Sequence, residues 1–347
     1  MNKNRKLINL QLFAPVAPNA TTDAALSDEM KTYYDKELIR LASANLVHDQ
    51  FAQTRDIPKN GGKTVEFRQF DPLPKSMVPL TEGVTPDGRK ISVNAKTADV
   101  EQYGDYVPYT DVIDLTAIDP MVLEITRLIA DQASRTLDSI TRDAIAAGTQ
   151  VNYVNNRLSR ATLTTSDKLD VDTIVRAATL LKRSNTPKIG GTDYVGIIHP
   201  DVAYDLMRDP EFIEWQKYTT SDKLFKGEIG KIGGVRFVET TEAKIWNDNT
   251  CPVKTAAVPA GEGTPAVDAT YYSVYSTLIV GANAYATTKV TGGGLQQIIK
   301  PIGYGQDPLN QRGSIGWKAM KVSEILVDAY MVRIESLSTY SDISEAN

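Results

Sequence analysis

Apolar residues recur every three or four positions between Asp119 and Gly148, which is the spacing of a helix with one apolar side. Asp119 suits the N-cap, Pro120 the first helical position, and Gly148 a left-handed residue that ends the helix. At 1.5 Å per residue this helix would be about 42 Å long, so it needs an equally long surface beneath it, and a β-sheet is the obvious supplier. The predicted buried stripe consists of Val122, Ile125, Ile129, Ala133, Leu137, Ile140, Ala144 and Ala147.

The opposite side of the predicted helix carries charges of alternating sign. Asp131 precedes Arg135 by four residues and Asp138 precedes Arg142 in the same way, which is the favourable order for ion pairs on a solvated face. The charged side is therefore predicted to face water along its whole length, and it contains Glu124, Arg127, Asp131, Arg135, Asp138 and Arg142.

Residues 57–110 have the alternating pattern of extended strands and predict a long β-hairpin. The strand signals are KTVEFRQF at 63–70 and GRKISVNAKTADVEQYGDYV at 88–107, with a Pro-Asp-Gly turn signal before the second. Few large apolar residues lie in this segment, so the hairpin needs something else to lie on, and that support could be another chain. The predicted tip, which we expect to take part in assembly, comprises Thr81, Glu82, Pro86, Asp87, Gly88 and Arg89.

The segment before the hairpin divides into two parts. Residues 1–27 predict an extended arm, because Pro15 and Pro18 discourage a helix. From the capping residue Ser27 onwards, the composition predicts a helix that ends near residue 52. His48 lies near that end, and we interpret it as a surface or interface histidine, because no second metal ligand lies at a suitable spacing.

The region after the long helix has the pattern of an α+β or α/β domain. Residues 169–185 predict an amphipathic helix capped by Asp170, and residues 193–200 predict a buried strand, followed by helical turns that Asp209 and Pro210 interrupt. His199 ends the strand, where catalytic residues do occur, but no nucleophile signature accompanies it. The glycines of 226–240 match no phosphate-binding loop, so we predict a turn leading into a strand at 235–238.

Strand signals return in 270–290 and again in 313–336. We expect these late strands to pair with one another beneath the long helix. The domain that contains this helix would then be discontinuous in sequence.

Composition limits the possible functions. The 347 residues include 41% hydrophobic residues and no apolar run near the roughly 20 residues of a membrane span, which predicts a soluble chain without membrane contact. The net charge of −5 argues against a dedicated nucleic-acid binder. One cysteine and two histidines disfavour a disulfide framework, a zinc site and a conventional active site. We therefore predict no catalytic, cofactor-binding or metal site.

Five segments together carry a resemblance to a known family. They are QYGDYVPYTD (102–111) with the helix after it, GIIHPDVAYDL (196–206), GEIGKIGGVRFVET (227–240), STLIVGANAY (276–285) and DPLNQRGSIGWKAM (307–320). With these segments, and with the order of its parts, the chain resembles a tailed-bacteriophage major capsid protein of the Hong Kong 97-like fold, in the N-four-type capsid protein family.

The resemblance implies an α+β capsid fold in four parts. These are an N-terminal arm and helix (1–56), an extended hairpin loop (57–110), a peripheral domain (111–165 and 282–347) whose spine helix (120–147) lies over a β-sheet, and an axial α/β domain (166–281). It also implies self-assembly into hexamers and pentamers of an icosahedral shell around double-stranded DNA. The DNA would be contacted non-specifically, and scaffolding and portal proteins would be partners. The chain would be part of the virion and would be assembled in the host cytoplasm.

Two alternatives remain open at this stage. An encapsulin-like compartment would share the fold but enclose protein cargo, so nuclease-protected DNA in particles separates it from a phage head. A carbohydrate-active hydrolase would instead require two acids converging in a cleft, with a raised pKa on one of them.

Overall fold

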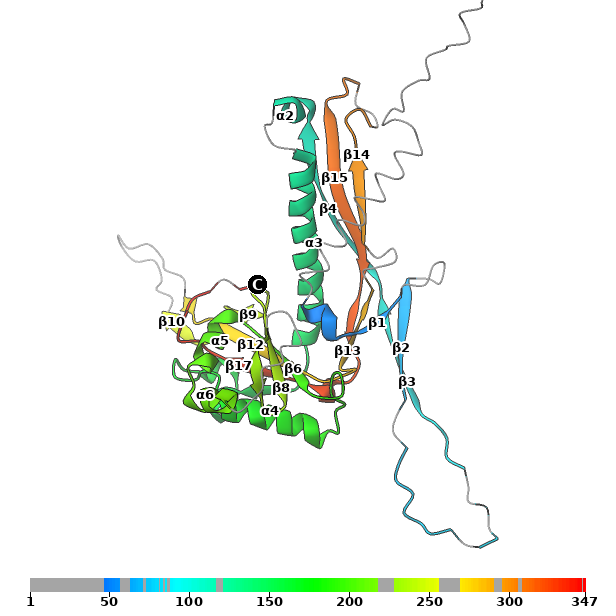
Figure 1. Cartoon of the computed structure of the whole chain (residues 1–347), viewed down its shortest axis with the longest axis vertical. Coiled ribbons are helices and arrows are strands. Elements are labelled where there is room, and N and C mark those ends of the chain that lie inside the picture. Colours follow the sequence, from blue (N-terminus) through cyan, green and yellow to red (C-terminus); the bar gives the residue numbers. More distant parts are fainter. Residues whose placement is uncertain are drawn as a thin grey trace, which may run out of the picture.

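The computed structural model describes residues 47–56, 63–70, 73–80, 82–83, 85, 88–116, 121–217, 228–255, 269–289, 295–304, 308–344 and 346–347. The arm predicted for 1–27 and most of the helix predicted from Ser27 lie outside these residues. The molecule is elongated (Figure 1). A long helix and a narrow sheet form one end, a hairpin forms the other, and a broader α/β unit lies to one side between them.

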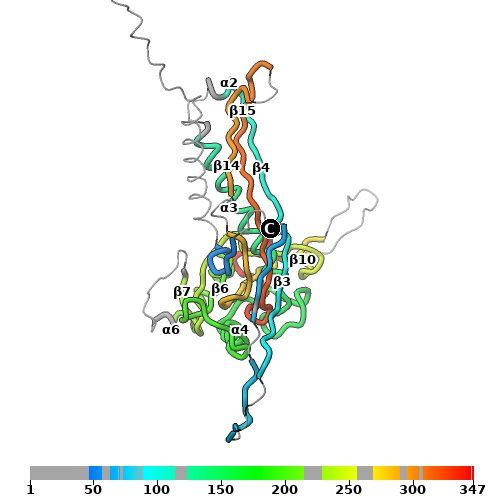
Figure 2. The backbone as a smooth tube through the Cα atoms, turned by 90° about the vertical axis from the view of Figure 1, so that its right-hand side faces the viewer, coloured from blue at the N-terminus to red at the C-terminus, as the bar shows by residue number. Residues whose placement is uncertain are grey.

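The long helix, α3 (Met121–Ala146), follows the short helix α2 (Asp111–Thr116) and lies along a three-stranded antiparallel sheet. The sheet has the order β14 (Leu295–Lys300), β15 (Arg312–Lys321), β4 (Glu101–Thr110), and Figure 2 shows these strands running beside the helix. The interface buries Ile125, Ile129 and Leu137 of α3 against Ile315 and Trp317 of β15. The sequence therefore correctly predicts a long helix whose apolar stripe lies on a sheet.

The prediction that the charged face of α3 is solvated is wrong for the second half of the helix. Asp138 and Arg142 are buried, because the turn η2 (His48–Phe51) and the strand β16 (Ser323–Ile325) pack against this part of the helix from a second side. Arg142 donates to the Glu242 carbonyl at 3.0 Å and pairs with the neighbouring Asp143. Arg135, expected to pair with Asp131, instead pairs with Glu242 at 2.9 Å.

The end of α3 also differs from the prediction at Gly148, which does not have a left-handed conformation. A glycine is needed at this position because there is no room for a side chain: an added Cβ would lie 2.2 Å from Cε of Met331. The last carbonyl groups of the helix are instead satisfied by Arg333, which donates to Ala146 and Gly148. Ala147, predicted to belong to the buried stripe, lies beyond the helix and is exposed.

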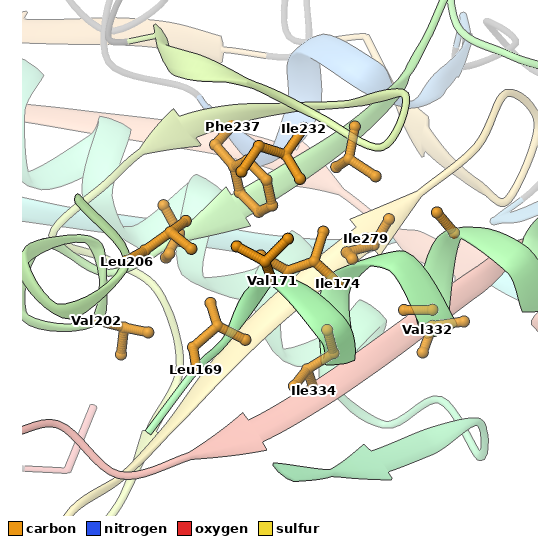
Figure 3. Close-up of a cluster of buried hydrophobic side chains, with 14 of the residues drawn as sticks. Leu169, Val171, Ile174, Val202, Leu206, Ile232, Phe237, Ile279, Val332 and Ile334 are labelled. Carbon is orange, nitrogen blue, oxygen red and sulfur yellow. The ribbon is translucent and has the colours of Figure 1, made fainter. Parts of the chain in front are cut away.

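The α/β unit is built on a seven-stranded mixed sheet. Helices α4 (Val171–Arg183), α5 (Pro200–Met207) and α6 (Pro210–Lys217) contribute to one core on this sheet, as Figure 3 shows for α4. Asp170 caps α4 by accepting a hydrogen bond from the Thr173 amide, as predicted. The strand order is β5 (Val151–Tyr153), β17 (Met331–Ser336), β12 (Val274–Val280), β6 (Tyr194–Ile198), β8 (Val235–Glu239), β7 (Glu228–Ile232), and β9 (Ile245–Trp246) pairs with β12.

The central strands of this sheet are buried on both faces, which explains why they are continuous apolar runs rather than alternating ones. Ile198, Phe237 and Ile279 point into the core shared with the helices. Val195 and Leu278 point to the other side, into a core that also contains Ile145 of α3. The second core therefore joins the α/β unit to the end of the long helix.

The hairpin consists of β2 (Thr64–Phe70) and β3 (Val93–Asp99), which pair antiparallel. It leaves the body beside a small sheet of β1 (Gln53–Arg55), β13 (Tyr285–Thr288) and β16. A separate two-stranded sheet joins β10 (Val253–Thr255) to β11 (Thr270–Tyr271), and short 3-10 turns occur at η3 (Val154–Asn156), η4 (Arg160–Thr162) and η5 (Asp328–Tyr330).

The structure corrects the predicted placement of several strands. Of the late strands, β15 lies along α3 and β16 contacts its second half, whereas β12 and β17 pair with each other inside the seven-stranded sheet, and β5 joins them there. The second half of the predicted hairpin strand separates at Val100 and becomes β4. Residues 228–232, predicted as part of a turn, form β7. The first two differences are long-range pairings that local sequence patterns do not specify. The third is local, because β7 pairs with the adjacent β8 across Gly233 and Gly234, a hairpin signal that the sequence analysis missed.

Candidate interaction surfaces

The base of the β2–β3 hairpin is fixed to the body. Val65, Phe67 and Val100 are buried against Ala286 of β13, and Lys96 Nζ donates to the Ile325 carbonyl at 2.7 Å. These contacts set the direction in which the hairpin leaves the body. The base therefore belongs to the fold, and what lies beyond it projects away (Figure 1).

Beyond its base, the hairpin exposes large apolar side chains. Met77 is 82% exposed and Leu80 is 77% exposed, although both belong to types that are commonly buried. Large apolar side chains exposed together on one projecting element indicate a site where another molecule binds. The set, called the hairpin surface below, consists of Phe70, Leu73, Met77, Val78, Leu80, Ile91 and Val93.

The tip residues predicted from sequence are only partly visible. Thr81, Pro86 and Asp87 lie outside the described residues, whereas Glu82, Gly88 and Arg89 are described and exposed. The sequence analysis identified the turn as the assembly element and missed the apolar residues beside it. The run LPKSMVPL at 73–80 was the available signal, since it is apolar without strand alternation.

The predicted core face of the long helix serves the fold and forms no separate site. Ile125, Ile129 and Leu137 are buried, Ile140 is half-buried against the same core, and the side chain of Val122 lies outside the described residues. The α2 end of this helix lies opposite the hairpin along the long axis (Figure 1), and a second apolar surface is formed by exposed side chains of the elements at this end. It contains Val112, Ile113, Leu123, Leu128, Tyr304 and Leu309.

A buried polar network holds the turn η2 on α3. His48, predicted to be a surface or interface histidine, is fully buried within the subunit, and its backbone amide and Nδ1 both contact the Asp138 carboxylate, at 2.8 and 2.6 Å. Lys321 pairs with Asp49, whose other oxygen accepts from Thr141 at 2.6 Å. The charged groups buried here are paired, which is the condition under which burial of charge is tolerated.

The Tyr285 hydroxyl completes this network by donating to the His48 carbonyl. Its burial, with the nearby Asp49 and Asp138 carboxylates, raises the pKa of Tyr285 well above its usual value. The phenol therefore stays protonated and keeps donating at any physiological pH. The network fixes the segment that enters the body from the N-terminal side.

Replacing Asp138 by Ala is expected to lower the free energy of unfolding by roughly 3 kcal/mol, because two buried donors of His48 lose their acceptor. Chemical denaturation with Asp131→Ala as the control measures this effect, since Asp131 is an exposed acid on the same helix. Equal stability of the two variants would contradict a structural role for the network.

His199 caps α5 instead of lying in an active site. Its Nδ1 accepts a hydrogen bond from the Asp201 amide at 3.2 Å, and its ring lies beside Tyr275, with 5.0 Å between the ring centroids. Burial lowers the pKa of His199, and burial followed by the Asp201 carboxylate raises the pKa of Tyr275 to about 12. The neutral imidazole is the form that accepts the capping bond.

The lowered pKa of His199 predicts a pH-dependent stability. The folded state binds fewer protons at His199, so this contribution is complete above the ordinary value of 6.5 and is lost as pH falls below it. His199→Asn keeps a capping side chain and removes the titration. We expect the melting temperature of the variant to fall less than that of the unmodified protein between pH 7.5 and 5.5. Parallel curves for the two proteins would contradict this assignment.

The carboxyl groups of the described residues lack the signature of the hydrolase alternative. Those with a shifted pKa are all shifted downward, and they are Glu66, Asp105, Asp167, Asp193, Asp248 and Asp342. Within the described ranges, no three His, Cys, Asp or Glu side chains gather to hold a metal ion. None of the helices described has the length and apolarity needed to cross a membrane.

Comparison with known proteins places this geometry in a family. The family model described as "Phage capsid protein" matches residues 94–330, from the β3 strand of the hairpin to η5. A comparison with curated proteins found no match in sequence.

Solved structures share the fold at low sequence identity. The capsid of Ralstonia phage GP4 is 14% identical, with a TM-score of 0.61, over 82% of this chain and 86% of that one. The head structure of Helicobacter pylori bacteriophage KHP40 is 12% identical, with a TM-score of 0.58, over 84% and 88%. The mature capsid of bacteriophage PhiM1 is 13% identical, with a TM-score of 0.55, over 84% and 87%. The chain therefore has the fold of these capsid subunits, the Hong Kong 97-like fold.

Proposed function

The chain belongs to the phage capsid protein family and is a major capsid protein, and we propose that its copies join into hexamers and pentamers of an icosahedral head that encloses double-stranded DNA. The observation that carries this proposal is the hairpin surface. Covering a large apolar side chain stabilises by about 1.5 to 3 kcal/mol, and the described part of the chain leaves seven of them uncovered on one projecting arm. A neighbouring copy is the partner that is always present in a growing shell.

The shape of the subunit supports the same proposal. Apolar surfaces are exposed at both ends of the long axis, so one copy presents different surfaces to different neighbours. Contacts between unlike surfaces form rings when the rotation closes, and obligate contacts of this kind bury about 2,000 to 5,000 Å². We assign the α3 sheet to the peripheral domain, and the seven-stranded sheet, including β5 and β17, to the axial domain.

The remaining partners follow from this role. The chain is a component of the virion, and we propose that the shell is assembled in the host cytoplasm with scaffolding and portal proteins. With a net charge of −5, contact with the enclosed DNA would be non-specific and local.

The test is to purify particles from cells that produce the phage and to examine them by negative-stain microscopy after nuclease treatment. We expect closed icosahedral shells of this chain that protect double-stranded DNA. Shells that protect protein cargo and no DNA would support an encapsulin-like compartment instead. A monomer without tendency to associate would contradict the assembly role.

A further inference from the structure

A polar groove lies at the β5 end of the seven-stranded sheet, between β5 and helix α4. It has a volume of about 740 Å³, and three arginines line it: Arg157, Arg176 and Arg183. β5 pairs with β17 on one side, and within the described residues no strand pairs with its other side. The groove is therefore an open edge of the axial domain.

The three arginines of this groove differ in their ion-pair partners. Arg157 pairs with the buried Asp167 at 2.8 Å, and Arg176 pairs with the exposed Asp172 at 2.8 Å. The side chain of Arg176 is nevertheless 53% exposed. Arg183 is also exposed and makes no ion pair with any residue that the structure describes. Arg176 and Arg183 thus remain accessible to carboxylates from outside.

A complementary surface occurs at the opposite end of the same sheet. Helix α6 packs against β7, which is the edge strand of the sheet at the end opposite β5. Its residue Phe212 is buried in the core, whereas Glu211 and Glu214 are exposed on either side of the 45% exposed Ile213. Neither glutamate makes an ion pair with another described residue. This end of the sheet therefore presents unpaired acids beside an apolar side chain.

We propose that axial domains contact head to tail within a ring, with Glu211 and Glu214 of one copy facing Arg176 and Arg183 at the groove of the next. This inference rests on the proposed assembly function and names the surfaces that form one of its contacts. A ring needs two unlike surfaces on each subunit, and surfaces at opposite ends of one sheet satisfy that need. Arginine pairs with carboxylates through two parallel hydrogen bonds, which fixes the register between neighbours as well as their order.

Packaged DNA is a second possible occupant of an arginine-lined groove, and the composition of the groove disfavours it. Asp170 and Asp172 also line the groove, and an acid there repels a phosphate. A surface that binds the DNA backbone needs a basic excess along its length. A short acidic helix fits the mixed lining better, because it can pair with Arg183, which has no ion-pair partner among the described residues, and with the exposed part of the Arg176 side chain.

The experiment is a charge exchange in the full-length chain. One variant combines Arg176→Glu with Arg183→Glu, a second combines Glu211→Lys with Glu214→Lys, and a third carries all four changes. Arg55→Glu is the control, since Arg55 is exposed on β1, outside the seven-stranded sheet and outside both exposed apolar surfaces. Circular dichroism and thermal unfolding establish that each variant is folded. Sedimentation velocity and negative-stain microscopy measure the assembled fraction.

We expect each pair of reversals to lower the assembled fraction by about tenfold or more, and the fourfold variant to recover most of it, because reversed charges attract again. A fourfold variant that assembles no better than the worse pair would overturn the proposal, as would normal assembly of both pairs. Normal shells with reduced DNA content in the arginine variant would assign the groove to DNA instead. Failure of the unmodified chain to assemble would count against the assembly function itself.

Discussion

Ile129→Asp is expected to yield protein that does not fold to a soluble state. Ile129 is 1% exposed at the middle of α3, where it packs against the β15 strand with Leu137 and Trp317. The change removes about 1.5 to 3 kcal/mol of apolar burial and places a carboxylate where no partner can reach it, which costs several kcal/mol more. The total approaches the 5 to 15 kcal/mol that stabilise a typical domain, so the peripheral domain should unfold.

The matched control is Leu128→Asp, one position earlier on the same helix. Leu128 is 69% exposed, so this variant should remain folded with a nearly unchanged melting temperature. Soluble yield after centrifugation and thermal unfolding distinguish the two variants. A soluble Ile129→Asp protein that melts at the same temperature as Leu128→Asp would contradict the orientation of α3.

The sequence predicts α3 well because both its length and its buried stripe are local properties. Helical spacing of Ile125, Ile129 and Leu137 is sufficient to locate the face that meets the sheet. It does not reveal Asp138, because a buried aspartate looks like a solvated one until its partner is known. That partner, His48, lies 90 residues away in sequence. The periodicity of apolar residues therefore does not predict that a second side of the helix is also buried.

Strand pairing is the part of the fold that local patterns leave open. β4 and β15 pair over ten residues from Glu101 to Thr110, yet the sequence around β4 continues the hairpin strand without an interruption. β17 likewise has the same apolar character as strands of either sheet. Only the three-dimensional contacts decide which edge each strand joins, because strand propensity measures fit to a half-buried pleated surface rather than to a particular neighbour.

Deletion of Thr81–Arg89 at the hairpin tip is expected to give a folded subunit that does not assemble. The residues that anchor the hairpin, Val65, Phe67 and Val100, are buried at its base and are untouched by the deletion. The tip lies beyond them and adds no buried side chain to the subunit in the described residues. The melting temperature of the unassembled subunit should therefore stay close to that of the unmodified chain, while shells disappear from negative-stain images.

A point variant separates loss of the loop from loss of its apolar side chains. Met77→Ser with Leu80→Ser keeps the length of the hairpin and removes two of its most exposed apolar groups, whereas Val253→Ser removes a 56% exposed valine from β10 as a control. If a neighbour covers Met77 and Leu80, their loss weakens each contact by about 3 kcal/mol, or over 100-fold in association constant. The control should assemble normally. Shells formed at unchanged protein concentration by both the deletion and the serine variant would remove the hairpin surface from assembly, because a covered apolar side chain cannot be lost without cost to the contact that covers it.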